Sequence, residues 1–321
     1  MRVIKRELDV LSIGETMALL VAQEPGALED VQNFSKRIAG ADTNVAIGLS
    51  RLGFKVGWIS RLGQDSFGRY VRTMIEREGV DTSQVAVDPE RSTGFMLKSR
   101  SLDGSDPRIE YYRRGSAASQ LCVADLSIEY ALKASHFHAT GITPALSNAA
   151  CELVIHAMQT MRSNGGTVSF DPNLRPSLWS DVDTMRNKLN KLAEHADWIL
   201  PGIEEGRILT GQSTPENIAS WYLDQGAKAV VIKLGADGAY FRTSTGEHGR
   251  VSGVPVAKIV DTVGAGDAFA VGIISARLEG ADWLSALRRA NWIASRALKV
   301  IGDMEGLPTR QELLEKFEHL K

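Results

Sequence analysis

The segment Asp261-Thr262-Val263-Gly264-Ala265-Gly266-Asp267 places two glycines and two carboxylates directly before a run of small and apolar residues, 268–278. Because glycine has no Cβ, Gly264 and Gly266 let the backbone turn tightly and approach a bound group closely. The first amides of a helix have no intrahelical acceptor and carry the positive end of its dipole. Since 268–278 has the composition of a helix, the amides of Gly264, Ala265 and Gly266 are predicted to form an anion site.

Asp267 follows these glycines directly. A carboxylate beside an anion site should repel the anion. Its presence there is explained if it acts on the group that attacks the anion. The economical role is that of a general base, which takes a proton from a hydroxyl while the amides hold a phosphate. We expect the helix dipole to keep Asp267 ionised at neutral pH. The alternative is that Asp267 only caps the helix.

Two further glycine turns, 39–44 and 233–238, and the segment Asp171–Arg175 each follow a predicted strand or loop. Ligands of a parallel sheet bind beyond the carboxyl ends of its strands, so these segments are expected to converge with 264–267. Arg175 would supply a fixed cation there, which suits a phosphate in transfer. The alternative for 233–238 is an ordinary hairpin turn.

The elements that must position these turns are predicted from hydrophobic periodicity and turn residues. Short apolar strands alternate with helices along most of the chain, which predicts a mostly parallel sheet with helices on both faces. Strands are expected at 10–13, 55–60, 135–140, 167–170, 198–200, 229–234, 238–242 and 249–254, a strand or loop at 256–260, and helices at 44–52, 67–78, 148–164, 183–195, 204–210, 218–225, 265–279, 283–298 and 310–320.

A hairpin formed by 93–101 and 108–114 interrupts this rhythm, with a polar turn at 102–107. It is predicted to build an accessory sheet with the less regular segment 16–38. No internal repeat or low-complexity linker divides the sequence. We therefore predict one α/β domain over residues 1–321, in which 16–38 and 94–114 form an inserted β lid.

Composition excludes several classes of protein. The 321 residues carry a formal net charge of −2 and a pI near 6.3, which give no general attraction to nucleic acid or to an anionic membrane. Two cysteines, Cys122 and Cys151, do not make a disulfide framework or a metal site. His136 and His138 are interpreted as structural residues of one strand. The charged N-terminus and the lack of an apolar run of roughly 20 residues predict a cytoplasmic protein.

Over nearly its full length the chain resembles the ribokinase-like, PfkB-type carbohydrate kinases. The resemblance rests on the stretch 261–269 and on N-terminal residues at the family's spacing, Gly40, Asn44, Ala46, Gly53 and Gly63. It implies a three-layer αβα ribokinase-like fold with a mostly parallel central sheet and a small β-sheet lid. It also implies transfer of the γ-phosphate of ATP to a sugar hydroxyl, with Mg²⁺ neutralising the phosphates.

The same resemblance implies which residues form the site. Those expected at the sugar are Gly40, Ala41, Asp42, Thr43, Asn44, Met96, Tyr111, Tyr112, Arg113, Arg175, Asp267 and Asp303. Those expected at ATP are Asn173, Arg175, Lys233, Leu234, Gly235, Ala236, Asp237, Gly238, Gly264, Ala265, Gly266 and Asn291. The catalytic group is expected to comprise Asp267 as base, the Gly264, Ala265 and Gly266 amides, and Arg175. The family's Asn-x-x-Glu motif is here Gly202-Ile203-Glu204-Glu205, so Glu205 alone is expected to contact magnesium, through water.

Within the family, the chain is similar to members that phosphorylate 2-keto-3-deoxygluconate along the stretches 109–117, 140–146, 171–179 and 302–308. Such a sugar acid, 2-dehydro-3-deoxy-D-gluconate, would receive the phosphate on its 6-hydroxyl. Arg113 with Tyr111 and Tyr112 is expected to bind the carboxylate and cover the sugar. Asp303 is expected to accept a hydrogen bond from a hydroxyl.

Alternatives to this substrate remain open: a neutral sugar, as in fructokinase or ribokinase; the substrate of 5-dehydro-2-deoxygluconokinase; and a non-catalytic sugar-binding protein on the same fold. One of Tyr111 and Tyr112 could instead pack within the sheet, because alternation puts them on opposite faces. The expected partners are the small sugar acid and ATP. An exposed sheet edge also favours a homo-oligomer formed through the lid sheet.

Overall fold

The computed structural model describes residues 6–100 and 107–317, and within these ranges the strands form two separate sheets. The large sheet has nine strands in the order β13-β12-β11-β10-β9-β8-β1-β4-β5. All neighbouring pairs are parallel except β11–β12 and β12–β13, which confirms the predicted mostly parallel sheet. Its strands are β1 Leu8–Ile13, β4 Val56–Gly63, β5 Asp81–Asp88, β8 Ala134–Thr140, β9 Thr167–Asp171, β10 Trp198–Ile199, β11 Ala229–Lys233, β12 Ala239–Thr243 and β13 His248–Val251.

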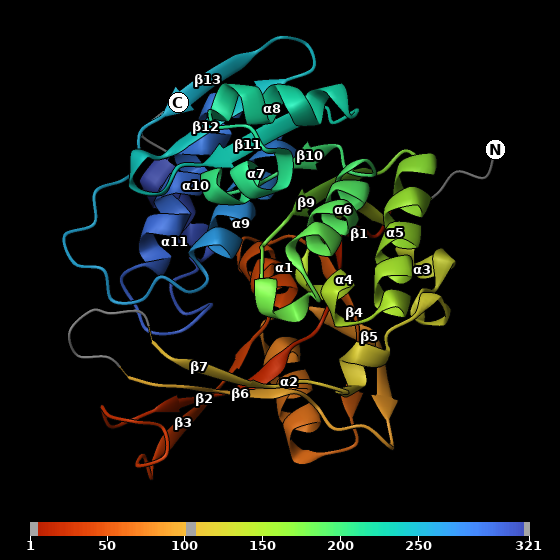
Figure 1. The fold of residues 1–321 in the computed structure, drawn as a ribbon, viewed down its shortest axis with the longest axis vertical. Helices are drawn as coiled ribbons and strands as arrows, with labels where there is room; N and C mark the ends of the chain where they lie inside the picture. The colour runs from red at the N-terminus through yellow and green to blue at the C-terminus, as the bar shows by residue number, and fades with distance from the viewer. Residues whose placement is uncertain (1–5, 101–106, 318–321) are drawn as a thin grey trace.

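Helices cover both faces of the large sheet, as Figure 1 shows. They are α1 Ala41–Arg51, α2 Ser66–Arg77, α3 Ile128–Ala131, α4 Ile142–Leu146, α5 Asn148–Ser163, α6 Val182–Ala193, α7 Ile203–Thr210, α8 Pro215–Asp224, α9 Ala265–Leu278, α10 Trp283–Ala297 and α11 Arg310–Phe317, with short 3₁₀ helices at Ala117–Gln120, Val123–Asp125, Pro176–Leu178 and Gly235–Asp237. None of the helices in the described ranges is long and apolar enough to cross a membrane.

The two faces of the large sheet bury two different hydrophobic clusters. One contains residues of α1, α2, α9, α10 and α11, and the other contains residues of α3, α5, α6, α7 and α8. Adjacent strand residues point to opposite faces, so Val231 joins the first cluster and Val230 the second. The three layers follow directly, because central strands such as β11 are apolar on both of their sides.

The small sheet has the order β3-β2-β6-β7 in the described residues, with β2 Met17–Ala22, β3 Phe34–Ala39, β6 Phe95–Lys98 and β7 Ile109–Tyr112. Strand β2 pairs with β6 in parallel, so the segment 16–38 and the hairpin do form one accessory sheet. It lies at the lower end of the molecule in Figure 1. Most of the predicted turn at 102–107 lies outside the described residues.

Local signals explain several boundaries. Asp65 begins α2 as predicted, because its Oδ1 accepts a hydrogen bond from the Gly68 amide at 2.7 Å. His136 and His138 are fully buried in β8 and bond to Ser169 of the neighbouring strand, each at 2.8 Å, which confirms their structural role.

The run 256–260, predicted as a strand or loop, is a loop in which Ile259 and Val260 are exposed. Two predictions about elements need correction. Strand β5 was not predicted, since its sequence is polar for much of its length and it lies at the edge of the sheet. Helix α1 begins at Ala41 rather than Asn44, and the last residues of the predicted helix 310–320 lie outside the described ranges.

Candidate active site

A cavity of about 460 Å³ lies between the small sheet and the carboxyl ends of the central strands. The predicted site residues that line it are Gly40, Ala41, Asn44, Met96, Tyr111, Arg113, Asn173, Arg175, Glu205, Lys233, Gly264, Gly266, Asp267 and Asp303. Segments as distant in sequence as 39–44, 171–175 and 262–267 therefore meet at one wall. The predicted convergence of these segments is therefore observed, although only 171–175 follows a parallel strand: 39–44 follows the antiparallel strand β3, and 262–267 follows a loop.

The glycine turn before α9 has a conformation that requires glycine at position 264. Gly264 has φ +79°, in the left-handed region, and a Cβ there would lie 2.3 Å from the Asp303 carbonyl oxygen. At Gly266 a Cβ would meet only the Lys233 Nζ, at 3.6 Å, on the cavity side. The first-turn amides of α9 thus begin at the cavity wall, beside a lysine ammonium.

Asp267 stands in the first turn of α9 and is only 7% exposed. Its Oδ2 accepts a hydrogen bond from Asn44 Nδ2 at 2.8 Å, and its Oδ1 accepts one from Asn173 Nδ2 at 3.3 Å. Asn173 has φ +41°, a left-handed conformation that is uncommon outside glycine. The two amide side chains hold the carboxylate in place without adding a charge.

Burial raises the pKa of Asp267 to about 7, with the neighbouring charges of Asp171 and Asp303 acting in the same direction. Asn44 and Arg175 act against this rise. The expectation that the helix dipole would hold Asp267 fully ionised at neutral pH is therefore wrong, because desolvation outweighs the dipole. The carboxyl group can instead gain or lose a proton near neutral pH.

Lys233 ends β11 and forms an ion pair with Asp171, the last residue of β9, at 2.7 Å. Glu205 lies 4.0 Å from the same ammonium. Burial disfavours the charged lysine, but Asp171 and Glu205 outweigh burial and raise the Lys233 pKa. Asp171 was not predicted as a site residue; its position at a strand end, two residues before Asn173, was the available signal.

The wall formed by the small sheet carries Tyr111, Arg113 and Met96. Arg113 is 9% exposed and pairs with Glu15, whose Oε2 lies 2.5 Å from Nη2 and 2.7 Å from Nε. Glu15 also accepts a hydrogen bond from Ser116 Oγ at 2.5 Å. Glu15 was missed by the sequence analysis, since a single glutamate after a strand has no distinguishing spacing.

The two tyrosines of β7 point to opposite faces of the small sheet. Tyr111 is 46% exposed and faces the cavity, whereas Tyr112 is 50% exposed and stacks on Phe95 with ring centres 4.6 Å apart. Alternation places them on opposite faces as expected. The alternative in which one of them packs within the sheet holds for Tyr112, whose ring lies on Phe95 of the neighbouring strand, and Tyr112 does not line the cavity as predicted.

A model of the pfkB family carbohydrate kinases matches residues 7–310. The chain belongs to the pfkB family of carbohydrate kinases. It is 50% identical over 308 residues to 2-dehydro-3-deoxygluconokinase of Bacillus subtilis strain 168, covering 96% of this chain and 94% of that one.

Among solved structures, a PfkB protein from Polaromonas sp. JS666 is 53% identical with a TM-score of 0.88, over 95% of this chain and 99% of that one. A putative ribokinase II from E. coli, in complex with ATP and Mg²⁺, is 30% identical with a TM-score of 0.87, over 98% of this chain and all of the other. These matches and the two sheets show the ribokinase-like α/β fold, and the chain is a carbohydrate kinase.

Several residues predicted for the kinase site do not line the cavity. Asp42 is buried and turned away from it: its Oδ1 accepts a hydrogen bond from the Thr140 amide at 3.2 Å and its Oδ2 accepts one from Thr143 Oγ1 at 3.1 Å. Burial raises its pKa to about 7. The Thr43 hydroxyl is likewise engaged, 2.8 Å from the Thr16 hydroxyl.

The remaining residues predicted for ATP do not line this cavity either. Asn291 of α10 donates from Nδ2 to the carbonyl oxygens of Val251 and Ser252, at 3.3 and 3.0 Å. A Cβ on Gly238 would lie 2.0 Å from the Val251 carbonyl, so this glycine allows β12 and β13 to approach. The other predicted ATP residues outside the cavity lining are Leu234, Gly235, Ala236, Asp237 and Ala265.

The donor atoms near Lys233 suit magnesium, which binds through one or two carboxylates and keeps several waters. Glu205 accepts the Gly202 amide on Oε2 at 2.6 Å and the Leu174 amide on Oε1 at 2.8 Å. Both oxygens are therefore held by backbone amides at the start of α7, and any contact with magnesium is expected to run through water. Within the described ranges, no group of three or more His, Cys, Asp or Glu residues is spaced to enclose a metal.

Proposed function

We propose that this kinase transfers the γ-phosphate of ATP to the 6-hydroxyl of 2-keto-3-deoxygluconate. One observation carries the chemistry: Asp267 sits in the glycine turn of α9, held by Asn44 and Asn173, with its pKa raised by burial to about 7. A base with a pKa near the working pH is the efficient choice for accepting a proton from a hydroxyl. The identity to the Bacillus subtilis enzyme supports the choice of sugar.

Each residue near the transferred phosphoryl group has a distinct role. Asp267 takes the proton of the attacking hydroxyl, and the amides of the 264–266 turn stabilise charge on the phosphoryl group. Lys233, close to Gly266, adds a positive charge at the same wall. Asp171 keeps Lys233 protonated and fixes its position. When bound, Mg²⁺ supplies further neutralisation of the phosphates, and Asp171 and Glu205 are the carboxylates placed to order its waters.

The sugar acid is oriented by the opposite wall of the cavity. Glu15 occupies the Nε and Nη2 side of Arg113, which leaves Nη1 without a partner among the described residues. That edge of the guanidinium and Tyr111 bind the substrate carboxylate. Arg175 donates from Nη1 to the Leu174 carbonyl at 2.9 Å and forms no ion pair within residues 6–100 and 107–317, so it remains available to the substrate.

The small sheet acts as a lid over the bound sugar. Strands β6 and β7 contribute Met96, Ile109 and Tyr111 to the cavity wall, so their closure would keep water from the transferring phosphate. Sugar binding should slow amide hydrogen exchange in β2, β3, β6 and β7. Equal exchange with and without sugar would show a fixed wall instead.

An ATP-consumption assay over a panel of sugars tests the proposal. The panel contains 2-keto-3-deoxygluconate, 5-dehydro-2-deoxygluconate, fructose and ribose, and the product is located on the 6-position by NMR. We expect 2-keto-3-deoxygluconate to be preferred over the neutral sugars by roughly ten- to hundredfold in kcat/KM, since a charge-assisted contact is lost with them. Preference for fructose or ribose would overturn the substrate, and no turnover with any sugar would point to a binding protein.

A further inference from the structure

Lys98, the last residue of β6, is a lysine buried in the small sheet with 2% of its surface exposed. Its Nζ lies 2.5 Å from Asp261 Oδ2 and 3.9 Å from Asp303 Oδ1. Lysine is almost never buried to this extent unless it is paired. Lys98 does not line the cavity of about 460 Å³, so pairing with these carboxylates, rather than contact with the sugar, accounts for its burial.

Asp261 connects Lys98 to the glycine turn before α9. Its Oδ1 accepts the Val263 amide at 3.1 Å, one residue before Gly264, and its Oδ2 accepts the Gly302 amide at 3.3 Å. Gly302 is followed by Asp303, whose carbonyl oxygen is the atom that excludes a side chain at Gly264. A single ammonium from the small sheet therefore fixes both loops that shape the start of α9.

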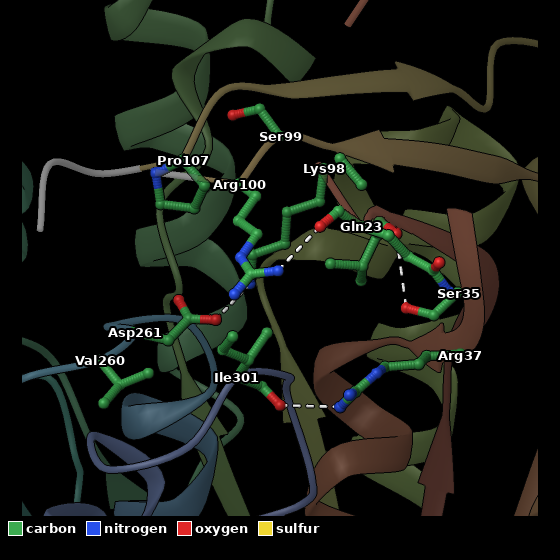
Figure 2. A pocket seen from close by; sticks show the side chains of 12 residues that line it. Gln23, Ser35, Arg37, Lys98, Ser99, Arg100, Pro107, Val260, Asp261 and Ile301 are labelled. Carbon is green, nitrogen blue, oxygen red and sulfur yellow. Dashed lines mark hydrogen bonds and ion pairs between the residues drawn. The ribbon is translucent and has the colours of Figure 1, made fainter. Parts of the chain in front are cut away.

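The ion pair between Lys98 and Asp261 is a principal connection between the small sheet and the glycine turn before α9, because a cavity lies beside it. A second cavity of about 440 Å³ lies beside it, lined on the sheet side by Ser35, Arg37 and Arg100 and on the loop side by Val260 and Ile301. Figure 2 shows Lys98 reaching across to Asp261 at its edge. Open space of this size means that little apolar packing joins the two parts there.

Arg37 of β3 makes the other contact across this cavity. Its Nη1 donates to the Ile301 carbonyl at 2.7 Å and to Glu305 Oε1 at 2.6 Å, with both side chains about a third exposed. This pair joins the same sheet to the same C-terminal loop. It is open to solvent, and neither partner contacts Asp261 or the glycine turn in the bonds described.

We propose that Lys98 is a positioning residue, which couples the small sheet to the anion-binding turn by holding Asp261 and, beside it, Asp303. The inference rests on the proposed function only in assigning the 264–266 turn to the phosphoryl group. When the sheet is in place, Lys98 neutralises two buried carboxylates and the turn is ordered. When the sheet moves away, both carboxylates lose their cation, so the turn loosens with it.

Lys98→Met and the matched control Arg37→Met, measured with whichever sugar the wild type phosphorylates, test the coupling. We expect Lys98→Met to lower kcat by roughly 10- to 100-fold, because a small displacement of the turn misplaces the phosphoryl group. The KM for the sugar should change by less than kcat does, because Lys98 itself lies outside the sugar cavity and reaches it only through Asp303. Arg37→Met should leave both constants within about twofold, as expected for an exposed pair.

Hydrogen exchange in the sugar-free proteins gives a readout that is independent of substrate identity. Peptides covering 261–266 should exchange faster in Lys98→Met than in Arg37→Met or the wild type. Unchanged exchange, or a kcat for Lys98→Met within about twofold of Arg37→Met, would overturn the coupling while leaving the sugar assignment untouched.

The double variant Lys98→Met/Asp261→Asn covers the case in which the single variant does not fold, since it removes both members of the shorter ion pair and leaves only Asp303, 3.9 Å from Lys98, without its cation. Its kcat should be as low as that of Lys98→Met, because both changes break the same link. Wild-type kcat in a folded double variant would also overturn the proposal.

Discussion

The two walls of the catalytic cavity stabilise their buried charges in different ways. On the wall formed by the large sheet, Lys233 is paired with Asp171, while Asp267 is held by the neutral amides of Asn44 and Asn173. On the wall formed by the small sheet, Arg113 is paired with Glu15. Only Asp267, of these buried groups, has neutral partners. The comparison teaches that burial raises the pKa of both carboxyl groups on the first wall, to about 7 for Asp267 and to about 6 for Asp171, where the charge of Lys233 acts against the rise.

The same comparison bears on the proposed substrate. The wall formed by the large sheet carries Asp171, Glu205 and Asp267 besides Lys233, and the wall formed by the small sheet carries Arg113. Under the proposed function, the sugar acid would place its carboxylate against Arg113 and its far hydroxyl against Asp267.

The largest effect should come from removing the base. Asp267→Asn keeps the shape and one hydrogen-bonding oxygen but cannot accept the proton, so kcat should fall by about 10²–10⁴-fold. Steady-state kinetics and calorimetric titration of ATP and sugar measure this, with binding expected to persist. A variant that keeps nearly full kcat would reduce Asp267 to a helix cap.

A change in the wall formed by the small sheet should alter the KM for the sugar. Arg113→Ala should raise the KM for 2-keto-3-deoxygluconate by roughly ten- to hundredfold, because a charge-assisted contact is lost, and should leave the KM for ATP nearly unchanged. The matched control is Arg114→Ala, which removes an exposed neighbouring arginine and should have little effect. If the two variants behave alike, the carboxylate is bound elsewhere, and Arg175 is the next residue to test.

The pH profile should show the proton affinity of Asp267. Its pKa is raised to about 7, and the base must be deprotonated to act, so kcat/KM should rise about tenfold from pH 6 to pH 8. The rise should disappear from the residual activity of Asp267→Asn. A profile that is flat down to pH 5 would mean that the carboxyl group is ionised throughout, as the helix dipole alone would predict.

The smallest effect concerns stability. Because the folded pKa of Asp267 lies above its unfolded value, its stabilising contribution is complete below about pH 4 and is lost as pH rises through about 7. Asp267→Asn does not ionise, so its unfolding free energy relative to wild type should be higher at pH 8.5 than at pH 6 by about 1–2 kcal/mol. Urea unfolding at both pH values measures the difference, in which other titrating groups cancel. An equal difference at the two pH values would contradict burial of a titrating carboxyl.

Much of the fold could be predicted because local signals and long-range packing agree. Apolar strands such as β11 end at a polar residue, Lys233, and the glycine turn before α9 is unmistakable in sequence. Strand β5 could not be predicted, since an edge strand with one solvent-exposed face requires few apolar residues. For the segment 256–260 the sequence left strand or loop open, and it is a loop whose apolar residues Ile259 and Val260 are exposed.

The site was predictable in its positions but not in its pairings. Sequence reasoning placed Asn44, Asn173, Lys233 and Asp267 at the site, and the structure brings all four to one cavity. It could not reveal that Asp42 turns towards Thr140 and Thr143, or that Glu15 holds Arg113. These contacts join residues about a hundred positions apart, and their partners carry no spacing that distinguishes them from ordinary surface residues.

The hydrogen bond between Asn44 and Asp267 joins residues 223 positions apart, which has a consequence for biosynthesis. While the ribosome is still making the middle of the chain, α1 and β1 have emerged, but α9 and α10, which cover the same face, have not. Val10, Val45 and Trp58 belong to that uncovered cluster, so the nascent chain presents apolar surface until translation is nearly finished. Truncated products would lack the base entirely and would be substrates for chaperones and proteases rather than partial enzymes.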